Sequence, residues 1–234
     1  MTAPGVLAFC AIDTIDLDQA KRLAASAAAA GFGIKLGKEF FTAHGPQGVR
    51  AVLPPGAALF LDLKFHDIPN TVAGGVRAAI AAVAPFCQTV HAGGGSAMLK
   101  AAVAEARAAK NTPLILAVTV LTSLDASDLA ATGVSGTVEA QVKRLAALAE
   151  AAGCDGVICA ATEIASLRTQ AGSKFKLVVP GIRPAGSDAG DQKRVMTPRE
   201  AMTLGADYLV IGRPITGATD PAAAARAIGT ELRT

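Results

Sequence analysis

The sequence predicts an α/β fold, a (β/α)₈ barrel of the TIM type that forms a single domain over residues 1–234. Short apolar runs alternate with amphipathic or alanine-rich segments along the chain, as in proteins whose strands and helices alternate. About eight such pairs fit into the sequence, which agrees with the size of a compact barrel. Polar side chains recur where the predicted strands end, and barrel enzymes have their active sites at the carboxyl ends of the strands.

The predicted strands are mostly continuous apolar runs, because parallel strands in such a fold are covered on both faces. In chain order they span residues 6–13, 32–37, 58–64, 89–92, 114–121, 156–160, 177–180 and 208–212. A doubly wound open sheet is the structural alternative. A dinucleotide-binding version of it is disfavoured, because no G-x-G-x-x-G motif follows the first strand and the glycine run at 93–95 lacks this spacing.

The predicted helices combine amphipathic spacing with a high alanine content, since alanine has the highest helix propensity. The alanine-rich stretches at 24–30 and 222–227 are the clearest examples. In chain order the predicted helices span residues 17–30, 39–53, 71–83, 96–108, 137–152, 164–170, 198–204 and 221–232. The longest irregular stretch is 181–197, and a loop of this length in a compact domain is either functional or disordered.

The composition argues against several kinds of partner. The formal net charge is only +3 and no dense run of Lys and Arg is present, so we expect no nucleic-acid binding. No apolar run approaches the ~18 residues of a membrane span, and the first residues lack the features of a signal peptide. We therefore expect a cytoplasmic protein without membrane contacts. The cysteines form no C-x-x-C pair and are expected to be buried as small apolar side chains: Cys10, Cys87, Cys154 and Cys159.

The most informative segment is the end of the third predicted strand. The apolar run 58–61 leads to Asp62 and Lys64, which point to the same face because side chains alternate along a strand. Asp67 follows in the loop, and Pro69 suits the first turn of the next helix. A buried face accepts an acid and a base only when they pair or perform chemistry. The segment therefore predicts a catalytic site at this strand end.

Other polar side chains occupy equivalent positions, which a barrel brings together at one mouth. They are Asp13 in the first strand, Lys35 in the second, His91 in the fourth, Thr122 and Ser123 after the fifth, Arg183 after the seventh and Arg213 after the eighth. Taken alone, an Asp at a strand end is more often a helix cap. Their convergence with the charges of the third strand instead favours an array of alternating sign, in which each member favours the charged form of its neighbours. A protonated Lys in such an array can donate a proton to a developing carbanion.

A divalent metal ion is the competing interpretation, because two aspartates and a histidine are suitable ligands. We do not expect a metal, since Lys35 and Lys64 would lie where the cation would bind.

The later part of the chain predicts a phosphate site, because Gly181, Gly212 and Arg213 follow the seventh and eighth strands. This is the usual phosphate-binding corner of such barrels. Together these features suggest a phosphorylated small molecule with a carbon centre that gains or loses a proton.

The segment 59–72 resembles the signature of the orotidine 5'-phosphate decarboxylase family. The pattern D-x-K-x-x-D-[IV]-[GP]-x-T is matched at every position from Asp62 to Thr71. Further motifs of the family are matched by residues 11–13, 34–37, 121–123, 179–183 and 211–215. The resemblance implies conversion of orotidine 5'-monophosphate to uridine 5'-monophosphate (UMP) and carbon dioxide without a cofactor or metal, which is the last step of de novo UMP synthesis. It also implies a homodimer with sites at the interface.

The resemblance further implies a role for each matched residue. Lys64 would donate the proton to C6 of the pyrimidine, and Asp62 would lie against the substrate carboxylate. Lys35 and Asp67 would complete the charged array, with Asp67 and the region of Thr71 reaching the site of the partner subunit. The remaining contacts would be Asp13 and Lys35 at the ribose with Thr71 supporting them, Thr122 and Ser123 at the pyrimidine, Pro180 along the substrate, and Arg183, Gln192, Gly212 and Arg213 at the phosphate.

Two functional alternatives remain open. A related barrel decarboxylase that acts on a sugar-phosphate β-keto acid has a similar D-x-K-x-x-D region but uses magnesium. Lys35, Thr122 and Ser123 favour the pyrimidine enzyme over it. A non-catalytic nucleotide-binding protein on the same fold would bind uridine nucleotides without turning them over. The sequence assigns no role beyond structure to His66 or His91.

Overall fold

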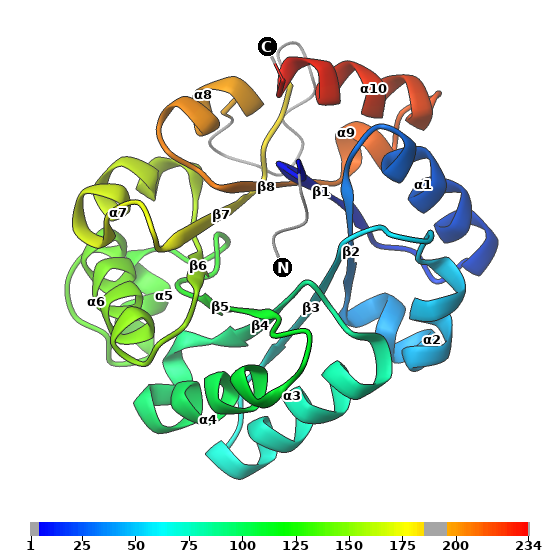
Figure 1. Cartoon of the computed structure of the whole chain (residues 1–234). Helices are drawn as coiled ribbons and strands as arrows, with labels where there is room; N and C mark the ends of the chain where they lie inside the picture. The colour runs from blue at the N-terminus through cyan, green and yellow to red at the C-terminus, as the bar shows by residue number, and fades with distance from the viewer. Residues whose placement is uncertain (1–4, 185–195, 234) are drawn as a thin grey trace.

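Eight parallel strands form a closed barrel in the computed structural model, which describes residues 5–184 and 196–233. The strands are β1 (Ala8–Ile12), β2 (Gly33–Gly37), β3 (Leu59–Phe65), β4 (Cys87–His91), β5 (Leu114–Val118), β6 (Gly156–Ile158), β7 (Lys176–Pro180) and β8 (Tyr208–Ile211). Strands that follow one another in the chain pair with each other, and β8 pairs with β1 to close the ring. Figure 1 looks into this ring, with the helices arranged around its outside.

Helices fill the connections between the strands. Within the described residues they are α1 (Leu17–Ala29), α2 (Lys38–Val52), α3 (Pro69–Val83), α4 (Gly95–Ala108), α5 (Ala126–Ala131), α6 (Val138–Ala151), α7 (Ile164–Ala171), α8 (Pro198–Thr203), α9 (Arg213–Thr216) and α10 (Pro221–Glu231), with the 3₁₀ helices η1 (Ala92–Gly94) and η2 (Ala161–Glu163). Because α10 lies beside α1, the helical layer closes together with the strands (Figure 1). In the part of the chain that the structure describes, no helix is long and apolar enough to cross a membrane.

Polar side chains fix where several helices begin. The Asp16 carboxylate accepts hydrogen bonds of 2.9 Å from the backbone N–H groups of Asp18 and Gln19 at the start of α1. Thr197 and Glu200 form a reciprocal capping box at the start of α8. Such caps satisfy backbone donors that have no partner within the helix, so they favour these helix starts over others nearby.

The predicted barrel is confirmed, and the predicted elements agree with the observed ones to within a few residues. The predicted fifth strand is too long, because beyond Val118 the pairing continues only through a long bond of 3.4 Å from Thr119 N to Ile158 O. The predicted fourth strand starts two residues too late, because the polar Gln88 interrupts the apolar run that would have marked the start of β4. Two short helices, α5 with six residues and α9 with four, were not predicted because so few residues show no helical periodicity.

Aromatic side chains fill the interior of the barrel toward its amino end. The rings of Phe9 and Phe60 meet edge to face with their centroids 5.4 Å apart, and Phe86 and Tyr208 pack against Phe9. Glycine is required at position 33, because a Cβ atom there would lie 2.4 Å from the Phe9 ring. A larger apolar layer lies between the strands and the helices, and the cysteines are buried and unpaired, as expected. With the amino end filled, the carboxyl end is where a ligand can enter.

Candidate active site

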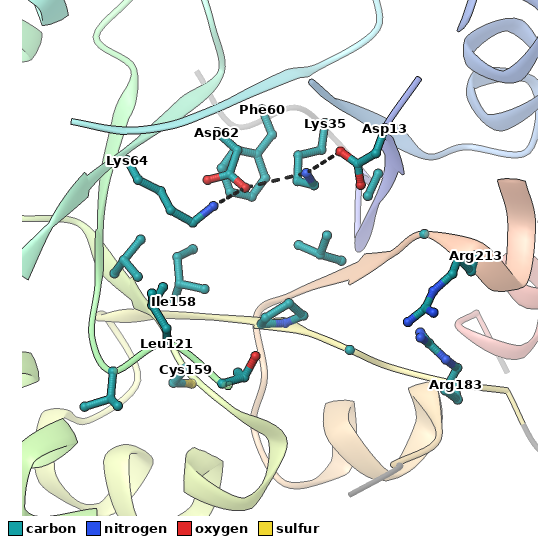
Figure 2. Close-up of a pocket in the computed structure, with 18 residues that line it drawn as sticks. Asp13, Lys35, Phe60, Asp62, Lys64, Leu121, Ile158, Cys159, Arg183 and Arg213 are labelled. Atoms are coloured by element: carbon teal, nitrogen blue, oxygen red, sulfur yellow. Dashed lines mark hydrogen bonds and ion pairs between the residues drawn. The ribbon is translucent and has the colours of Figure 1, made fainter. Parts of the chain in front are cut away.

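A cavity of about 310 Å³ lies among residues at the carboxyl ends of the strands. This volume is in the range of small-molecule sites, and this end of a barrel is where substrates bind. Figure 2 shows its arrangement, with the side chains of Asp13, Lys35, Asp62 and Lys64 along one side and those of Arg183 and Arg213 at the end away from Lys64. Apolar side chains line the rest of the cavity. The cavity therefore has two separate charged regions.

The charged side chains form a continuous row that runs from Asp13 through Lys35 and Asp62 to Lys64 (Figure 2). Lys35 Nζ lies 3.6 Å from Asp13 Oδ1 and 3.5 Å from Asp62 Oδ2. Lys64 Nζ lies 2.8 Å from the same Oδ2 atom. Asp13 follows β1, Lys35 is in β2, and the other two residues are in β3. Three neighbouring strands thus bring these four predicted residues together.

Asp62 is largely buried and is held by donors on both carboxylate oxygens. The Thr89 hydroxyl donates to Oδ1 at 2.9 Å, and the Lys64 ammonium donates to Oδ2. Burial raises the pKa of this carboxyl, but the positive charges of Lys35 and Lys64 and the two hydrogen bonds outweigh burial. The pKa of Asp62 therefore lies below its ordinary value of 3.8. Asp62 is a fixed negative charge at neutral pH.

The backbone of Lys64 adopts an uncommon conformation. Its φ angle is +50°, in the left-handed region that residues other than glycine rarely adopt. The β3–β4 pairing also changes register between Leu61 and Phe65. Such bulges re-aim side chains and are frequent beside active sites. The prediction that Asp62 and Lys64 share a face assumed a regular strand. The structure does bring the two side chains together, but the strand between them is irregular.

Two arginines lie at the other end of the cavity. Arg183 follows β7 and is buried, and Arg213 opens α9. Figure 2 shows their side chains pointing toward one another, across the cavity from Lys64. Arg183 N donates to Met196 O at 3.1 Å, so the described residues on either side of 185–195 lie side by side. Two guanidinium groups at one place suit an anionic group such as a phosphate.

Apolar side chains line the cavity between its two charged regions. Val118, Ile158 and Val210 come from three different strands, and Phe60 lies behind the charged row. Cys159 also lines the cavity, but burial raises the pKa of its thiol far above the ordinary value, so the group is neutral. An apolar lining excludes water, which strengthens the electrostatic interactions of the neighbouring charges.

The predicted site residues fall into four groups. Those that line the cavity are Asp13, Lys35, Asp62, Lys64, Thr122, Pro180, Gly181, Arg183, Gly212 and Arg213. Ser123 lies in an adjoining hollow that shares Thr122 and Pro180 with the cavity. Asp67 and Thr71 are exposed and lie outside the cavity, with Asp67 Oδ1 accepting a hydrogen bond from Ile68 N. Gln192 lies outside the described residues.

Thr89 touches the charged row but was not predicted. Besides donating to Asp62, its hydroxyl accepts a hydrogen bond of 2.9 Å from the backbone N–H of Lys64. The signal in the sequence was the spacing of Thr89 from Cys87. Residues two positions apart in a strand share a face, and Cys87 packs inside the barrel, so Thr89 also faces inward. A predicted strand that began only at 89 made this alternation hard to recognise.

The two histidines near this mouth form a pair. The rings of His66 and His91 are stacked with their centroids 5.0 Å apart. Burial lowers the pKa of His91, and the neighbouring charges of His66, Lys38 and Lys64 add to this effect, so His91 is neutral at pH 7. His91 Nδ1 accepts a hydrogen bond from Gly93 N, which gives it a structural role in the turn after β4. Neither ring lines the cavity.

The donor groups of the cavity are a poor match for a metal ion. Among residues 5–184 and 196–233, no group of three or more His, Cys, Asp and Glu side chains is placed to hold one. Asp62, the most enclosed carboxylate of the row, already has the ammonium groups of Lys35 and Lys64 beside it. A cation at this carboxylate would have to displace a charge of the same sign.

Comparison with known proteins shows the family to which this chain is similar. Residues 8–228 match the model of the "Orotidine 5'-phosphate decarboxylase / HUMPS family". The chain is 56% identical over 230 residues to an orotidine 5'-phosphate decarboxylase of Rhodospirillum rubrum, with 96% of this chain and 93% of that protein covered. It is 47% identical over 233 residues to the enzyme of that name from Teredinibacter turnerae, with both chains covered completely.

The fold agrees with solved structures of the same name. The crystal structure of orotidine 5'-phosphate decarboxylase from Lactobacillus acidophilus superposes with a TM-score of 0.86 at 35% sequence identity, covering 98% of this chain and 100% of that one. The enzyme from Methanocaldococcus jannaschii, solved with the inhibitor BMP, superposes with a TM-score of 0.77 at 17% identity and supports the barrel fold alone.

Proposed function

The chain belongs to the orotidine 5'-phosphate decarboxylase / HUMPS family, and from this premise we propose that it converts orotidine 5'-monophosphate to UMP and carbon dioxide. The observation that carries the proposal is one cavity with a row of alternating charges on one side and two arginines at the far end. The row suits a reacting carboxylate, and the arginines suit a phosphate. A nucleotide with both groups spans the two charged regions.

Lys64 is the proposed proton donor. When the bond between C6 and the carboxylate breaks, carbon dioxide leaves and the electron pair remains on C6. The Lys64 ammonium transfers a proton to C6, which completes UMP, and the amine then takes a proton from solvent. An ammonium that is held in place before the reaction stabilises the developing negative charge without reorganisation. The hydrogen bond to Asp62 and the conformation of the β3 backbone support this role because they fix the position of Lys64.

Asp62 has two proposed tasks. It holds the ammonium groups of Lys35 and Lys64 through one oxygen, and it faces the carboxylate of the bound substrate. Because its pKa is low, it stays charged beside that carboxylate and disfavours the bound ground state relative to the product. Lys35 lies between Asp13 and Asp62, from where the pair Asp13 and Lys35 can also bind the ribose hydroxyls.

The rest of the cavity is assigned to substrate binding. Arg183, Gly212 and Arg213 are the proposed phosphate-binding residues among those described, and Gln192 is a further candidate from the sequence. The phosphate lies far from the reacting carbon, so its binding energy can position the pyrimidine for reaction. Thr122, Ser123 and Pro180 are assigned to the side of the substrate nearer the adjoining hollow.

We further infer a homodimer in which Asp67 and Thr71 reach the site of the partner subunit. Both residues are exposed and neither lines the cavity of its own chain. Ile68, next to Asp67, is 66% exposed, and Ile15 in the β1–α1 connection is 61% exposed. Large apolar side chains that are exposed near a charged group suit an interface with a second copy, because association would bury them.

The direct test follows the ultraviolet absorbance of orotidine 5'-monophosphate with purified protein, with and without EDTA. We expect rapid conversion that EDTA does not change. No conversion by folded protein would reject the proposal. Activity that EDTA abolishes would instead favour a magnesium-dependent decarboxylase of sugar-phosphate β-keto acids. The two ammonium groups beside Asp62 argue against this alternative. UMP binding without turnover would favour a non-catalytic nucleotide-binding protein.

A further inference from the structure

Thr89 joins the two central residues of the charged row through a single oxygen atom. Its hydroxyl donates to Asp62 Oδ1 at 2.9 Å and accepts the backbone N–H of Lys64 at 2.9 Å. Thr89 is completely buried, so water does not compete for these bonds. A hydroxyl has one proton, and here that proton is directed to Asp62 because the Lys64 N–H occupies an acceptor position.

The β-bulge explains why a side chain is needed at this point. Leu61 pairs with Gln88 and Phe65 pairs with Val90, so three residues of β3 lie opposite Thr89 alone. The regular ladder cannot satisfy every backbone group of the longer strand. The Thr89 hydroxyl takes the N–H of Lys64, the residue with the left-handed backbone. An unsatisfied N–H at this partly buried position would cost free energy, and the left-handed backbone of Lys64 would lose the hydrogen bond that holds it.

The same hydroxyl sets the orientation of the Asp62 carboxylate. With Oδ1 bound to Thr89, Oδ2 is the oxygen that faces both Lys35 and Lys64. Rotation of the carboxylate would break the bond to Thr89 and change both distances to the ammonium groups. Thr89 therefore acts on the side chain of one charged residue and on the main chain of the other.

We propose that Thr89 is a positioning residue for the decarboxylation, which holds Asp62 and the Lys64 backbone in the geometry that proton transfer requires. The inference rests on the proposed function. Thr89 is not among the residues that line the cavity, so it acts through its two partners and not on the substrate. Misplacement of a reacting group by about 1 Å can cost on the order of 100-fold in rate.

The test compares kcat with UMP affinity in Thr89→Val, which keeps the shape of the side chain and removes the hydroxyl. We expect kcat to fall by about 10-fold to 100-fold, with the dissociation constant of UMP changed by less than about threefold. Thr89→Ser retains the hydroxyl and is expected to keep most of the wild-type kcat. A wild-type kcat in Thr89→Val, or an equal loss in Thr89→Ser, would overturn the inference.

Thr119→Val is the matched control. Thr119 is also completely buried, and its hydroxyl donates to Ile158 O at 2.9 Å, away from the charged row. We expect this variant to lose stability to a similar degree while it keeps its kcat. If Thr89→Val does not fold, the pair Thr89→Ser and Thr89→Ala decides the question, since the two differ by one oxygen atom. Equal kcat values in that pair would overturn the inference.

The pH profile separates positioning from packing. The groups that face Asp62 are Lys35 on β2, Lys64 on β3 and Cys87 on β4, with Asp13 beyond Lys35. All of them remain in Thr89→Val, which removes the hydrogen bond to the carboxylate and the acceptor of the Lys64 N–H but no charged group. The acid limb of kcat should therefore move to higher pH in this variant, and it should not move in Thr119→Val. An inactive wild-type protein would reject the proposed function itself, whereas an unshifted, active Thr89→Val would reject only this inference.

Discussion

Lys35 and Lys64 share one oxygen atom, Oδ2 of Asp62, at distances of 3.5 and 2.8 Å. A single carboxylate oxygen thus balances two ammonium groups in a cavity with apolar walls. The arrangement keeps the two lysines at fixed positions despite their repulsion. It also makes Asp62 the residue on which the charge balance of the site depends.

Asp62→Asn is expected to reduce kcat by at least about 100-fold, because Lys64 then loses its counter-charge and Lys35 keeps only Asp13. Steady-state kinetics with orotidine 5'-monophosphate checks this outcome. Full activity in the variant would show that the charge of Asp62 is not needed.

The stability of the protein should depend on the charge of Asp62 in a defined pH range. The pKa of Asp62 is lowered in the folded state, so its contribution is present above the unfolded pKa, near 3.8, and is lost as pH falls through the lower folded pKa. The difference in the free energy of unfolding between wild type and Asp62→Asn should be constant near pH 7 and should narrow below about pH 4. Urea titrations at several pH values measure this difference in the free energy of unfolding. A difference that widens in acid would contradict a lowered pKa of Asp62 in the folded state.

Lys64→Ala is expected to lower turnover by at least about 1000-fold while UMP binding largely survives, because the variant lacks the proton donor but keeps the arginine pair. Isothermal titration with UMP and single-turnover kinetics separate the two effects. Lys100→Ala, at an exposed position of α4, is the control and should behave as wild type. Near-normal turnover in Lys64→Ala would remove Lys64 from the mechanism.

Arg213→Ala is expected to weaken the binding of phosphorylated ligands by about 10-fold to 100-fold, the usual range for a lost charge-assisted hydrogen bond. Binding of uridine, which has no phosphate, should change little. The comparison of UMP and uridine affinities measures this, and the exposed Arg226→Ala on α10 serves as the control. Equal losses for both ligands would mean that Arg213 does not act through the phosphate.

A mixture of two inactive variants tests the shared site. Lys64→Ala and Asp67→Ala lack different parts of it, so a mixed dimer would contain one site with both residues. After subunit exchange in equal amounts, roughly a quarter of the wild-type activity should return, since half of the dimers are mixed and each has one intact site. Analytical ultracentrifugation of the unmodified protein gives the oligomeric state. A monomer, or a mixture that stays inactive after proven exchange, would refute the proposed interface.

The sequence predicted the barrel because each buried strand leaves a continuous apolar run, and it predicted the convergence of Asp13, Lys35, Asp62 and Lys64 because carboxyl ends of barrel strands meet. It could not predict the bulge in β3, since no glycine or proline marks the left-handed residue and nothing local distinguishes it from a regular strand. Thr89 was missed for the same reason, because its role arises only where the two strands lose register.

The way the barrel closes also bears on its synthesis. The ring is complete only when β8 pairs with β1, so β1 has an unpaired edge until residues 208–211 have left the ribosome. The half of the cavity with Lys64 is translated long before the half with Arg213. Until β8 is available, the edge strands β1 and β7 both lack the partner that closes the ring.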